Sequence, residues 1–315
     1  MNVLVTGASG YVGNRLMEFL DGEPAVQKVI GLDVKPPPRQ FRKLEFHSRD
    51  VRDPGLAALF QQTRPEVVVH LAFVLNPIHN RRLMRDIDVN GSANVLNAAA
   101  ASGARKVIVA SSATAYGAHP DNPEWLTESA PIRGNREFSY SSDKAEVEAL
   151  CAKFAREHPG VVLTVLRPSV VVGPTQKNYL LNKVLPPRTY FMVRGLTPLM
   201  QFVHEEDMAR VYREAILKDR PGAWNVTGDG GLTMEEMAKI AGKRTVRFFM
   251  GVAKFGMGLA WLLRRIDAPP SVIPFIAYPW TMDNRKIKEE WGFRFNYTSE
   301  EAFRKLAESE RGRPR

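Results

Sequence analysis

The start of the chain contains a strand, a glycine-rich turn and a helix in direct succession. The apolar run NVLV leads into TGASGYVG, and the helix-like segment YVGNRLMEFL follows. Gly7, Gly10 and Gly13 are three residues apart, which suits a tight turn, close approach of the backbone to a pyrophosphate and close packing of the helix on the sheet. Because a helix N-terminus presents free N–H groups, this order predicts a dinucleotide site.

Short apolar runs then alternate with helix-like segments. The runs are KVIGLD, LEFHSRD, EVVVHLA and KVIVASS, and the helix-like LMRDIDVNGSANVLNAAAASG separates the last two. Such alternation predicts a parallel sheet with helices on both faces. Right-handed crossovers make such a sheet doubly wound. We therefore expect an α/β fold of the Rossmann type.

The pattern loosens after the strand-like run VVLTVLRPSVVVGP, which glycine and proline end. Short helical pieces then alternate with proline-bearing loops. We predict that residues 1–173 form mainly the dinucleotide-binding domain. Residues 174–315 should form mainly a smaller mixed substrate-binding part, from which segments can return to the Rossmann core.

Composition limits the partners and the compartment. The chain has 315 residues, 44% hydrophobic and 25% charged, which is typical of a globular protein. Cys151 is the only cysteine, so an intrachain disulfide and a cysteine-rich metal site are excluded, and we expect a cytoplasmic protein without a metal. The net charge is +10, but the basic residues are scattered, so nucleic-acid binding is not predicted.

The most apolar segment is FFMGVAKFGMGLAWLL, at residues 248–263. It is shorter than the ~20 residues that a membrane-spanning helix needs. We expect a helix that packs on the domain or over the substrate cleft. A helix on a membrane surface is the weaker alternative.

Asp33 ends the second apolar run, twenty residues after Gly13. A carboxylate there accepts hydrogen bonds from the adenosine ribose hydroxyls and repels a 2′-phosphate, so we predict NAD rather than NADP. The nearby cations Lys35 and Arg39 weaken this preference.

Tyr140 and Lys144 stand four residues apart in YSSDK and share one face of a helix. The Lys144 ammonium is expected to favour ionisation of the Tyr140 phenol, which lowers its pKa from ~10 toward the working pH. A phenol of that kind can exchange a proton with a substrate hydroxyl.

Taken together, these motifs resemble the extended short-chain dehydrogenases/reductases, specifically the NAD-dependent epimerase/dehydratase group, over nearly the whole chain. TGASGYVG is similar to the family's cofactor turn, HLA to its fourth-strand motif, SSATAYG to its serine motif and YSSDK to its YxxxK. DVNGSANVLNAA, RPSVVVGP and QFVHEEDMA resemble its other landmarks. Within the group, the resemblance is to sugar-nucleotide 4-epimerases.

The resemblance implies roles for individual residues. Ser112, Tyr140 and Lys144 would be catalytic, with Ser111 as the fallback for the serine, and Lys144 would also bond the nicotinamide ribose. Asp50 and Val51 would contact the adenine, Leu71 and Ala72 would line the nucleotide path, and Asn90 would be structural. The predicted cofactor-binding set is Gly7, Gly10, Tyr11, Val12, Gly13, Asp33, Asp50, Val51, Leu71, Ala72, Tyr140, Lys144 and Pro168.

Some positions depart from the family pattern. Ala113 and Thr114, the predicted substrate contacts, stand where dehydratases carry an acidic pair, which argues against dehydration. Val170 and Met200 stand where sugar-nucleotide epimerases commonly carry asparagine and arginine. His204 is expected to order a loop, and Cys151, Trp280, Trp291 and Tyr278 are expected to pack in the core.

The leading hypothesis is an NAD-dependent epimerase-like oxidoreductase that acts on a secondary hydroxyl or keto carbon of a sugar or sugar nucleotide. One alternative is an NAD(P)-dependent dehydrogenase or reductase of a hydrophobic alcohol or ketone, of the sterol or flavonoid type. The other is a non-catalytic NAD-binding sensor or scaffold. Family resemblance also implies a homodimer formed through the long helices after Asn90 and Tyr140.

Overall fold

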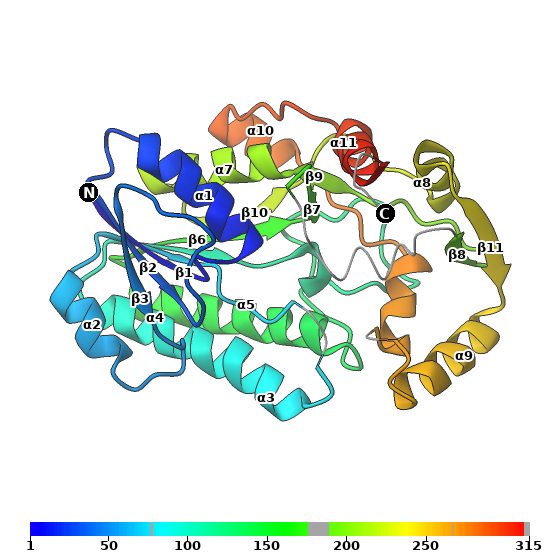
Figure 1. The fold of residues 1–315 in the computed structure, drawn as a ribbon, viewed down its shortest axis with the longest axis horizontal. Helices are drawn as coiled ribbons and strands as arrows, with labels where there is room; N and C mark the ends of the chain where they lie inside the picture. Colours follow the sequence, from blue (N-terminus) through cyan, green and yellow to red (C-terminus); the bar gives the residue numbers. More distant parts are fainter. Residues whose placement is uncertain (76–77, 176–188, 267, 312–315) are drawn as a thin grey trace.

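A seven-stranded parallel sheet forms the centre of the molecule (Figure 1). The computed structural model describes residues 1–75, 78–175, 189–266 and 268–311. The strand order is β10-β6-β5-β4-β1-β2-β3. The strands are β1 (Asn2–Thr6), β2 (Lys28–Asp33), β3 (Leu44–Ser48), β4 (Val67–His70), β5 (Lys106–Ala110), β6 (Val162–Pro168) and β10 (Gly222–Val226). The predicted Rossmann-type fold is confirmed.

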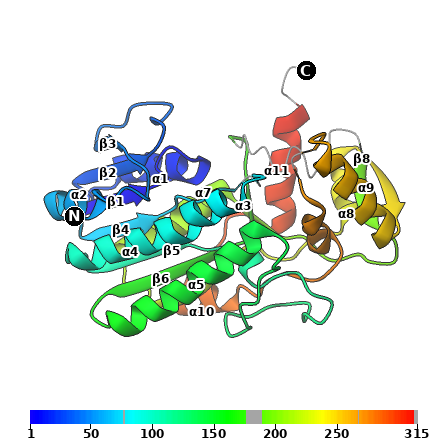
Figure 2. The ribbon, with the colours of Figure 1, turned by 90° about the horizontal axis from the view of Figure 1, so that it is seen from below.

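Helices cover both faces of this sheet (Figures 1 and 2). Successive residues of a strand point to opposite faces, so Val3 and Val5 contribute to one core and Leu4 to the other. The first core is closed by α1 (Tyr11–Gly22) and α7 (Glu205–Leu217), and the second by α2 (Leu56–Thr63), α4 (Gly91–Ala101) and α5 (Ser139–Glu157). The strand residues of each core come from the apolar runs of the sequence.

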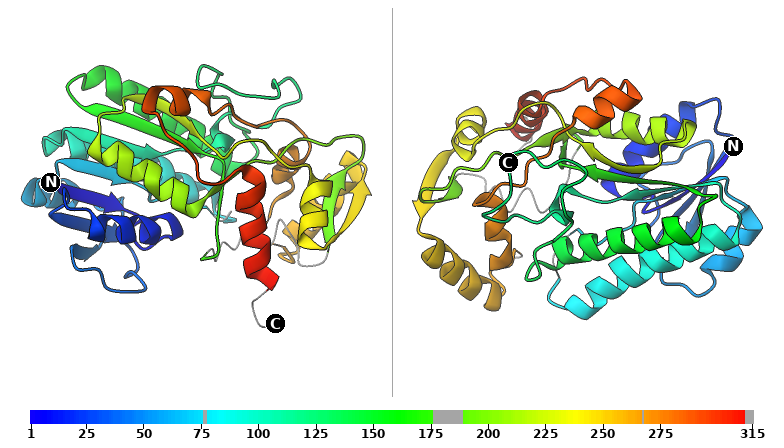
Figure 3. Two further views of the ribbon diagram at one scale, coloured as in Figure 1. Left: turned by 90° about the horizontal axis from the view of Figure 1, so that it is seen from above. Right: turned by 180° about the vertical axis from the view of Figure 1, so that it is seen from behind.

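One sheet strand comes from the later part of the chain. β10 pairs in parallel with β6, with Trp224 beside Leu166 and Val226 beside Pro168. Beyond it, α10 (Arg285–Trp291) lies near α7 (Figure 3). Residues after 173 therefore build one edge of the central sheet and two of its covering helices, α7 and α10.

A smaller lobe lies at the end of the molecule opposite the N-terminus (Figure 1). Two parallel strand pairs, β8 with β11 and β7 with β9, are packed with helices. Phe202, Met237 and Phe303 join β9, α8 and α11 in one apolar cluster. The elements are β7 (Val170–Val172), β8 (Thr189–Val193), β9 (Phe202–His204), α8 (Met234–Ala241), β11 (Arg244–Phe248), α9 (Met250–Leu262), η3 (Pro270–Ile276) and α11 (Ser299–Arg311).

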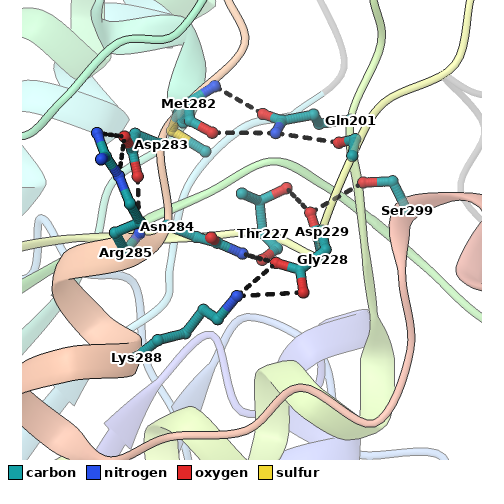
Figure 4. Close-up of polar contacts among 11 residues, drawn as sticks. Gln201, Thr227, Gly228, Asp229, Met282, Asp283, Asn284, Arg285, Lys288 and Ser299 are labelled. Atoms are coloured by element: carbon teal, nitrogen blue, oxygen red, sulfur yellow. Dashed lines mark hydrogen bonds and ion pairs between the residues drawn. The ribbon is translucent and has the colours of Figure 1, made fainter.

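Hydrogen bonds fasten three distant segments of the later chain to one another (Figure 4). The Gln201 side chain binds the backbone of Met282 through both its donor and its acceptor, at 3.0 and 2.6 Å. The amide of Asn284 donates to Thr227 O and to Asp229 Oδ1, both at 2.8 Å. These bonds satisfy buried backbone groups where the chain passes between the lobe and the sheet.

The apolar segment at residues 248–263 forms the end of β11 and then α9. One face of α9 packs on the lobe, where Met250, Ala253 and Met257 contact the cluster of Val193, Ile273 and Ala277. None of its residues is buried, however. The expected packing therefore holds for one face only. No helix in the described ranges has the length and hydropathy to cross a membrane.

Candidate active site

The glycine turn between β1 and α1 leaves no room for side chains. Gly7 has a φ of +68°, and a Cβ there would lie 2.7 Å from Ala72 N. A Cβ on Gly13 would lie 2.3 Å from Gly7 O. No side chain caps the N-terminus of α1, which begins after Gly10. The turn thus offers bare backbone and free N–H groups, which suit a pyrophosphate.

Tyr11 and Val12 form the first turn of α1 behind these glycines. The Tyr11 hydroxyl donates to the Glu205 carboxylate on α7, which also accepts from Thr175 Oγ1 at 2.7 Å. Burial raises the Tyr11 pKa above its ordinary value. The Tyr11 phenol therefore joins α1 to α7.

Asp33 lies at the end of β2 next to the same turn. Its Oδ2 accepts from Ser9 N at 3.0 Å, and its Oδ1 accepts from Lys35 N at 3.3 Å. Arg39 pairs instead with Glu18, and no ion pair joins Asp33 to Lys35 or Arg39 in the described structure. The carboxylate is thus free of the two neighbouring cations and fits a ribose diol.

The predicted adenine and nucleotide contacts lie around the same sheet edge. Arg52 binds the Asp50 carboxylate through Nη2 at 2.7 Å and Nε at 3.0 Å, and this hydrogen bonding lowers the Asp50 pKa. Val51 packs against Gly91. The N–H groups of Leu71 and Ala72 donate to Thr6, to its carbonyl at 3.1 Å and its hydroxyl at 3.3 Å, which places the pair beside Gly7.

The three predicted catalytic residues come together at the carboxyl end of the sheet. Ser112 follows β5 and caps the short helix η2 (Ala113–Ala115), while Tyr140 and Lys144 lie one turn apart in α5. The Ser112 hydroxyl lies close enough to the Tyr140 phenol to lower its pKa. The Lys144 ammonium lies 5.8 Å from the centroid of the Tyr140 ring.

The two predicted substrate residues support the serine. Ser112 Oγ accepts from Thr114 N at 3.2 Å and from Thr114 Oγ1 at 2.9 Å. Ala113 is buried. Ser111 is directed elsewhere, since its hydroxyl donates to Glu148 Oε1 at 2.5 Å. Of the two serines, the structure brings Ser112 to Tyr140.

Burial dominates the proton affinities of the pair. It raises the Tyr140 pKa to about 12, and the neighbouring Ser112 hydroxyl offsets part of this rise. Burial also lowers the Lys144 pKa to about 7. Lys144 Nζ donates to Ala110 O at 2.6 Å and lies 3.5 Å from the centroid of the Phe73 ring. The expected lowering of the phenol pKa by Lys144 is therefore wrong for this structure, because burial raises that pKa and only Ser112 lowers it.

Two site residues were not predicted, Phe73 and Asp88. Phe73 packs its ring edge to face with Tyr140 at 5.4 Å. Asp88 lies in η1 (Asp86–Asn90), a π turn between α3 (Arg81–Arg85) and α4, and π turns are frequent at functional sites. Its Oδ1 accepts from Val74 N at 2.7 Å, and burial raises its pKa to about 7. Asp88 and Asn90 both lie in the motif DVNG, and the family resemblance implied a role only for Asn90.

Asn90 itself is exposed. Its amide donates to Asp86 Oδ1 at 2.8 Å, on the surface of the π turn. Asp88 Oδ2 is buried and has no hydrogen-bond partner in the described ranges. Of the two side chains, the structure therefore places Asp88 in the interior near Lys144 and leaves Asn90 as a local surface contact.

A buried ion pair lies next to the predicted catalytic residues. Arg167 on β6 binds Glu148 on α5 through Nη2 at 2.5 Å and Nε at 2.8 Å, and its Nη1 donates to the Tyr116 hydroxyl at 2.7 Å. The side chains are only 6% and 8% exposed. Because Ser111 also bonds Glu148, this cluster ties the ends of β5 and β6 to the helix that carries Tyr140.

Histidine and cysteine are used structurally. His70 bridges Thr6 Oγ1 at 2.7 Å and Ser92 Oγ at 2.8 Å, and burial lowers its pKa to about 3, so it stays neutral. His204 caps α7, accepting from Glu206 N at 3.3 Å. Burial raises the Cys151 pKa to about 12, which keeps the thiol protonated. The described residues contain no cluster of potential metal ligands.

The remaining predicted positions are apolar or structural. Pro168 ends β6, half-buried, and Val170 begins β7. Met200, at the position where the resemblance led us to look for an arginine, packs with Leu232 and Met234. Trp280 and Trp291 are buried, as expected of core residues, and Tyr278 packs partly buried in the cluster that contains Trp280.

A cavity of about 540 Å³ lies beside the loop that leads into α5. Its lining residues do not include Ser112, Tyr140 or Lys144. Arg133, one of its cations, is held by Asp121 at 2.7 Å and by Asn122. The lining consists of His119, Arg133, Gly134, Asn135, Arg136, Glu137, Ser271 and Pro274.

Known proteins are similar to this chain to differing extents. An uncharacterized protein of Mycobacterium tuberculosis is 26% identical over 96% of this chain and 82% of its own. A UDP-glucose 4-epimerase of Oryza sativa is 34% identical over 56% of this chain and 46% of its own. A 3beta-hydroxysteroid-dehydrogenase/decarboxylase of Arabidopsis thaliana is 27% identical over 87% of this chain and 65% of its own.

Among solved structures, the UDP-glucose 4-epimerase of Thermus thermophilus in complex with NAD superposes with a TM-score of 0.76. The two chains are 24% identical, and the match covers 99% of each. The sequence model of the NAD dependent epimerase/dehydratase family matches residues 3–227, which include the glycine turn, Ser112, Tyr140 and Lys144. The chain is a member of the NAD dependent epimerase/dehydratase family.

Proposed function

We propose that this protein is an NAD-dependent, epimerase-like oxidoreductase acting at a secondary hydroxyl or keto carbon of a sugar or sugar nucleotide. The observation that carries the proposal is the grouping of Ser112, Tyr140 and Lys144 at the carboxyl end of the sheet that also carries the bare glycine turn. Ligands of doubly wound sheets bind at this edge. NAD, when bound, supplies the hydride acceptor at its nicotinamide ring.

The residues of the chain would manage the proton at the reacting oxygen. Tyr140 is protonated at neutral pH, so its phenol is ready to donate to a keto oxygen and to take the proton back from a hydroxyl. Ser112, held by Thr114, would fix that oxygen through a second hydrogen bond. Lys144, with a pKa near 7, would bond the nicotinamide ribose when protonated.

Two observations bear on the reaction class. Ala113 is buried and the Thr114 hydroxyl is engaged with Ser112, so these positions provide no acidic pair to remove a ring proton and expel water. This argues for epimerisation or simple oxidoreduction over dehydration. The rice and Thermus thermophilus relatives are both named as UDP-glucose 4-epimerases, which supports a sugar nucleotide.

A second candidate substrate is a hydrophobic alcohol or ketone. Val170 and Met200 pack against apolar neighbours where polar anchors for a nucleotide diphosphate would stand. The Arabidopsis relative is named as a hydroxysteroid dehydrogenase. This candidate predicts net oxidation of the substrate rather than inversion of a centre.

The two candidates differ in what happens to the reduced cofactor. We expect UDP-glucose to yield an epimeric product in nuclear magnetic resonance spectra, while fluorescence of free NADH stays at background because the hydride returns to the substrate. Stoichiometric release of NADH with a sterol or another hydrophobic alcohol would establish the second candidate instead. If NAD binds and neither substrate class turns over, the protein is a cofactor-binding sensor or scaffold.

Asp33 should determine the choice of cofactor. We expect calorimetry to show NAD binding more tightly than NADP, because the carboxylate accepts from the ribose hydroxyls and repels a 2′-phosphate. Asp33→Ala should weaken NAD binding by about tenfold or more, since hydrogen bonds to a charged group contribute ~1.5–3 kcal/mol. Glu157→Gln, at the exposed end of α5, should change nothing. Tighter binding of NADP to the unaltered protein would refute the assignment.

A cytoplasmic homodimer is also proposed. The free, buried Cys151 thiol is compatible with a reducing compartment. α4 and α5 lie side by side on one outer face (Figure 2), where two copies could pair them. Sedimentation equilibrium would give the mass of the assembly.

A further inference from the structure

The outer face of α9 carries an apolar stripe that nothing in the described structure covers. Val252, Phe255, Leu259 and Leu262 follow one another at helical spacing and are 58%, 76%, 48% and 76% exposed. Phe249 and Leu263 extend the stripe at its ends, at 63% and 59%. Because these side chains are exposed on the outer face of α9, they do not cover Ser112, Tyr140 and Lys144.

The exposed apolar surface is concentrated in one place. Of the eleven large hydrophobic residues that are exposed in the described ranges, eight belong to β8, β11, α9 and the residues adjoining them. They are Phe191, Val246, Phe249, Val252, Phe255, Leu259, Leu262 and Leu263. A contiguous patch of this kind marks an interaction surface, whereas single exposed residues do not.

The charge around the patch is predominantly basic, although Arg247 pairs with Glu235 at 2.8 Å and Lys243 with Glu310 at 3.4 Å. Residues 243–266 contain six basic residues, Lys243, Arg244, Arg247, Lys254, Arg264 and Arg265, and no acidic residue. Lys254, Arg264 and Arg265 make no ion pair within the described ranges, and all three are exposed. Arg194, from the end of β8, lies over the Phe249 ring at 5.0 Å and adds a further cation. A surface that complements this one is apolar at its centre and anionic around it.

We propose that α9 docks on an anionic phospholipid membrane and lies in the plane of its interface. Apolar side chains flanked by Lys and Arg are the pattern by which helices bind such surfaces. The helix is about 20 Å long, too short to cross the ~30 Å hydrocarbon core. A second copy is a poorer occupant, because a symmetric contact would oppose two faces of like charge.

The docked orientation places the membrane near the substrate side of the molecule. The Trp261 ring, at the C-terminal end of α9, stacks on His79 with a centroid distance of 3.9 Å. His79 lies between β4 and α3, in the segment that also carries Phe73. Phe73 in turn contacts Lys144 and Tyr140. Trp261 of α9 and the pair of Tyr140 and Lys144 therefore both contact residues of the segment between β4 and α3.

Flotation of the full chain with lipid vesicles tests this proposal. We expect binding to vesicles of phosphatidylcholine with phosphatidylserine, weaker binding as salt increases, and little binding to phosphatidylcholine alone. Phe255→Asp with Leu262→Asp should reduce the partition coefficient by about tenfold or more. Arg264→Ala and Arg265→Ala should each reduce it by roughly fivefold. Leu83→Asp, on the exposed surface of α3, is the matched control and should bind normally.

Three results would overturn the proposal. These are absence of flotation, equal flotation with neutral and anionic vesicles, and flotation that the α9 substitutions leave unchanged. Self-association in the absence of lipid that Phe255→Asp abolishes would assign the face to a second copy instead. Since all substituted side chains are exposed, the variants should keep the thermal unfolding midpoint of the unaltered protein, and cofactor binding provides a second check on their folding.

Discussion

Replacing Tyr140 with phenylalanine is expected to abolish turnover, by about a thousandfold or more, while NAD affinity stays nearly unchanged. The substitution removes only the hydroxyl beside Ser112 and leaves the ring against Phe73. General acid–base catalysis by a positioned group contributes ~10²–10⁴ to a rate, so its loss should appear in kcat rather than in cofactor binding. Steady-state kinetics and calorimetry on the same preparation would measure both.

Tyr190→Phe is the matched control for this experiment. Tyr190 lies buried on β8 in the small lobe, in the cluster with Met237 and Phe303, so loss of its hydroxyl should leave kcat unaltered. Substantial activity in Tyr140→Phe would show that another group moves the proton. In that case the buried carboxyl of Asp88, whose pKa of about 7 suits proton exchange, would be the next group to replace.

Replacing Arg167 with methionine is expected to cost ~3–5 kcal/mol of unfolding free energy. The guanidinium is the partner of Glu148 in a pair with 6% and 8% exposed side chains, and its removal strands a carboxylate in the interior. Methionine fills much of the same volume, so the loss reports on charge rather than on a cavity. Denaturant unfolding followed by circular dichroism would measure it.

A double substitution and a surface pair calibrate that measurement. Adding Glu148→Leu removes the stranded charge and should recover about half or more of the loss, although Ser111 then loses its carboxylate partner and Tyr116 keeps only Asn225. Arg304 pairs with Glu300 on α11 with both side chains about half exposed, so Arg304→Met should cost no more than ~0.5 kcal/mol. Equal losses in Arg167→Met and Arg304→Met would mean that burial of the first pair contributes nothing.

Most of the fold was predictable because local signals repeat along the chain. Apolar runs such as VVVH and KVIVA appear as β4 and β5, and Gly7 and Gly13 stand where a Cβ would collide with backbone. The meeting of Ser112 with Tyr140 follows from the fold, since a strand of the sheet delivers the serine and a helix on its face delivers the tyrosine. Periodicity and turn chemistry act over a few residues, so sequence alone reveals them.

The residues that were missed depend on contacts between distant segments. Asp88 is buried within the π turn η1, and Phe73 contacts Lys144 from the segment that follows β4. Neither contact leaves a pattern in nearby sequence. The direction of the Tyr140 pKa was also mispredicted, because pairing with Lys144 can be inferred from spacing whereas desolvation depends on everything packed around the phenol.

The sequence was sufficient for the sheet, the glycine turn and the family, since these rest on short motifs and their order along the chain. It also indicated that Tyr140 and Lys144 share one helix face, because they are four residues apart. The tertiary structure alone decided which serine meets the tyrosine, how burial shifts the two pKa values, and that Glu148 and Arg167 form a buried pair next to them. It also decided that the apolar face of α9 points outward, which hydropathy could not tell from a core helix. Burial depends on how the whole chain packs. A local pattern therefore shows which residues are apolar but not which of them are covered.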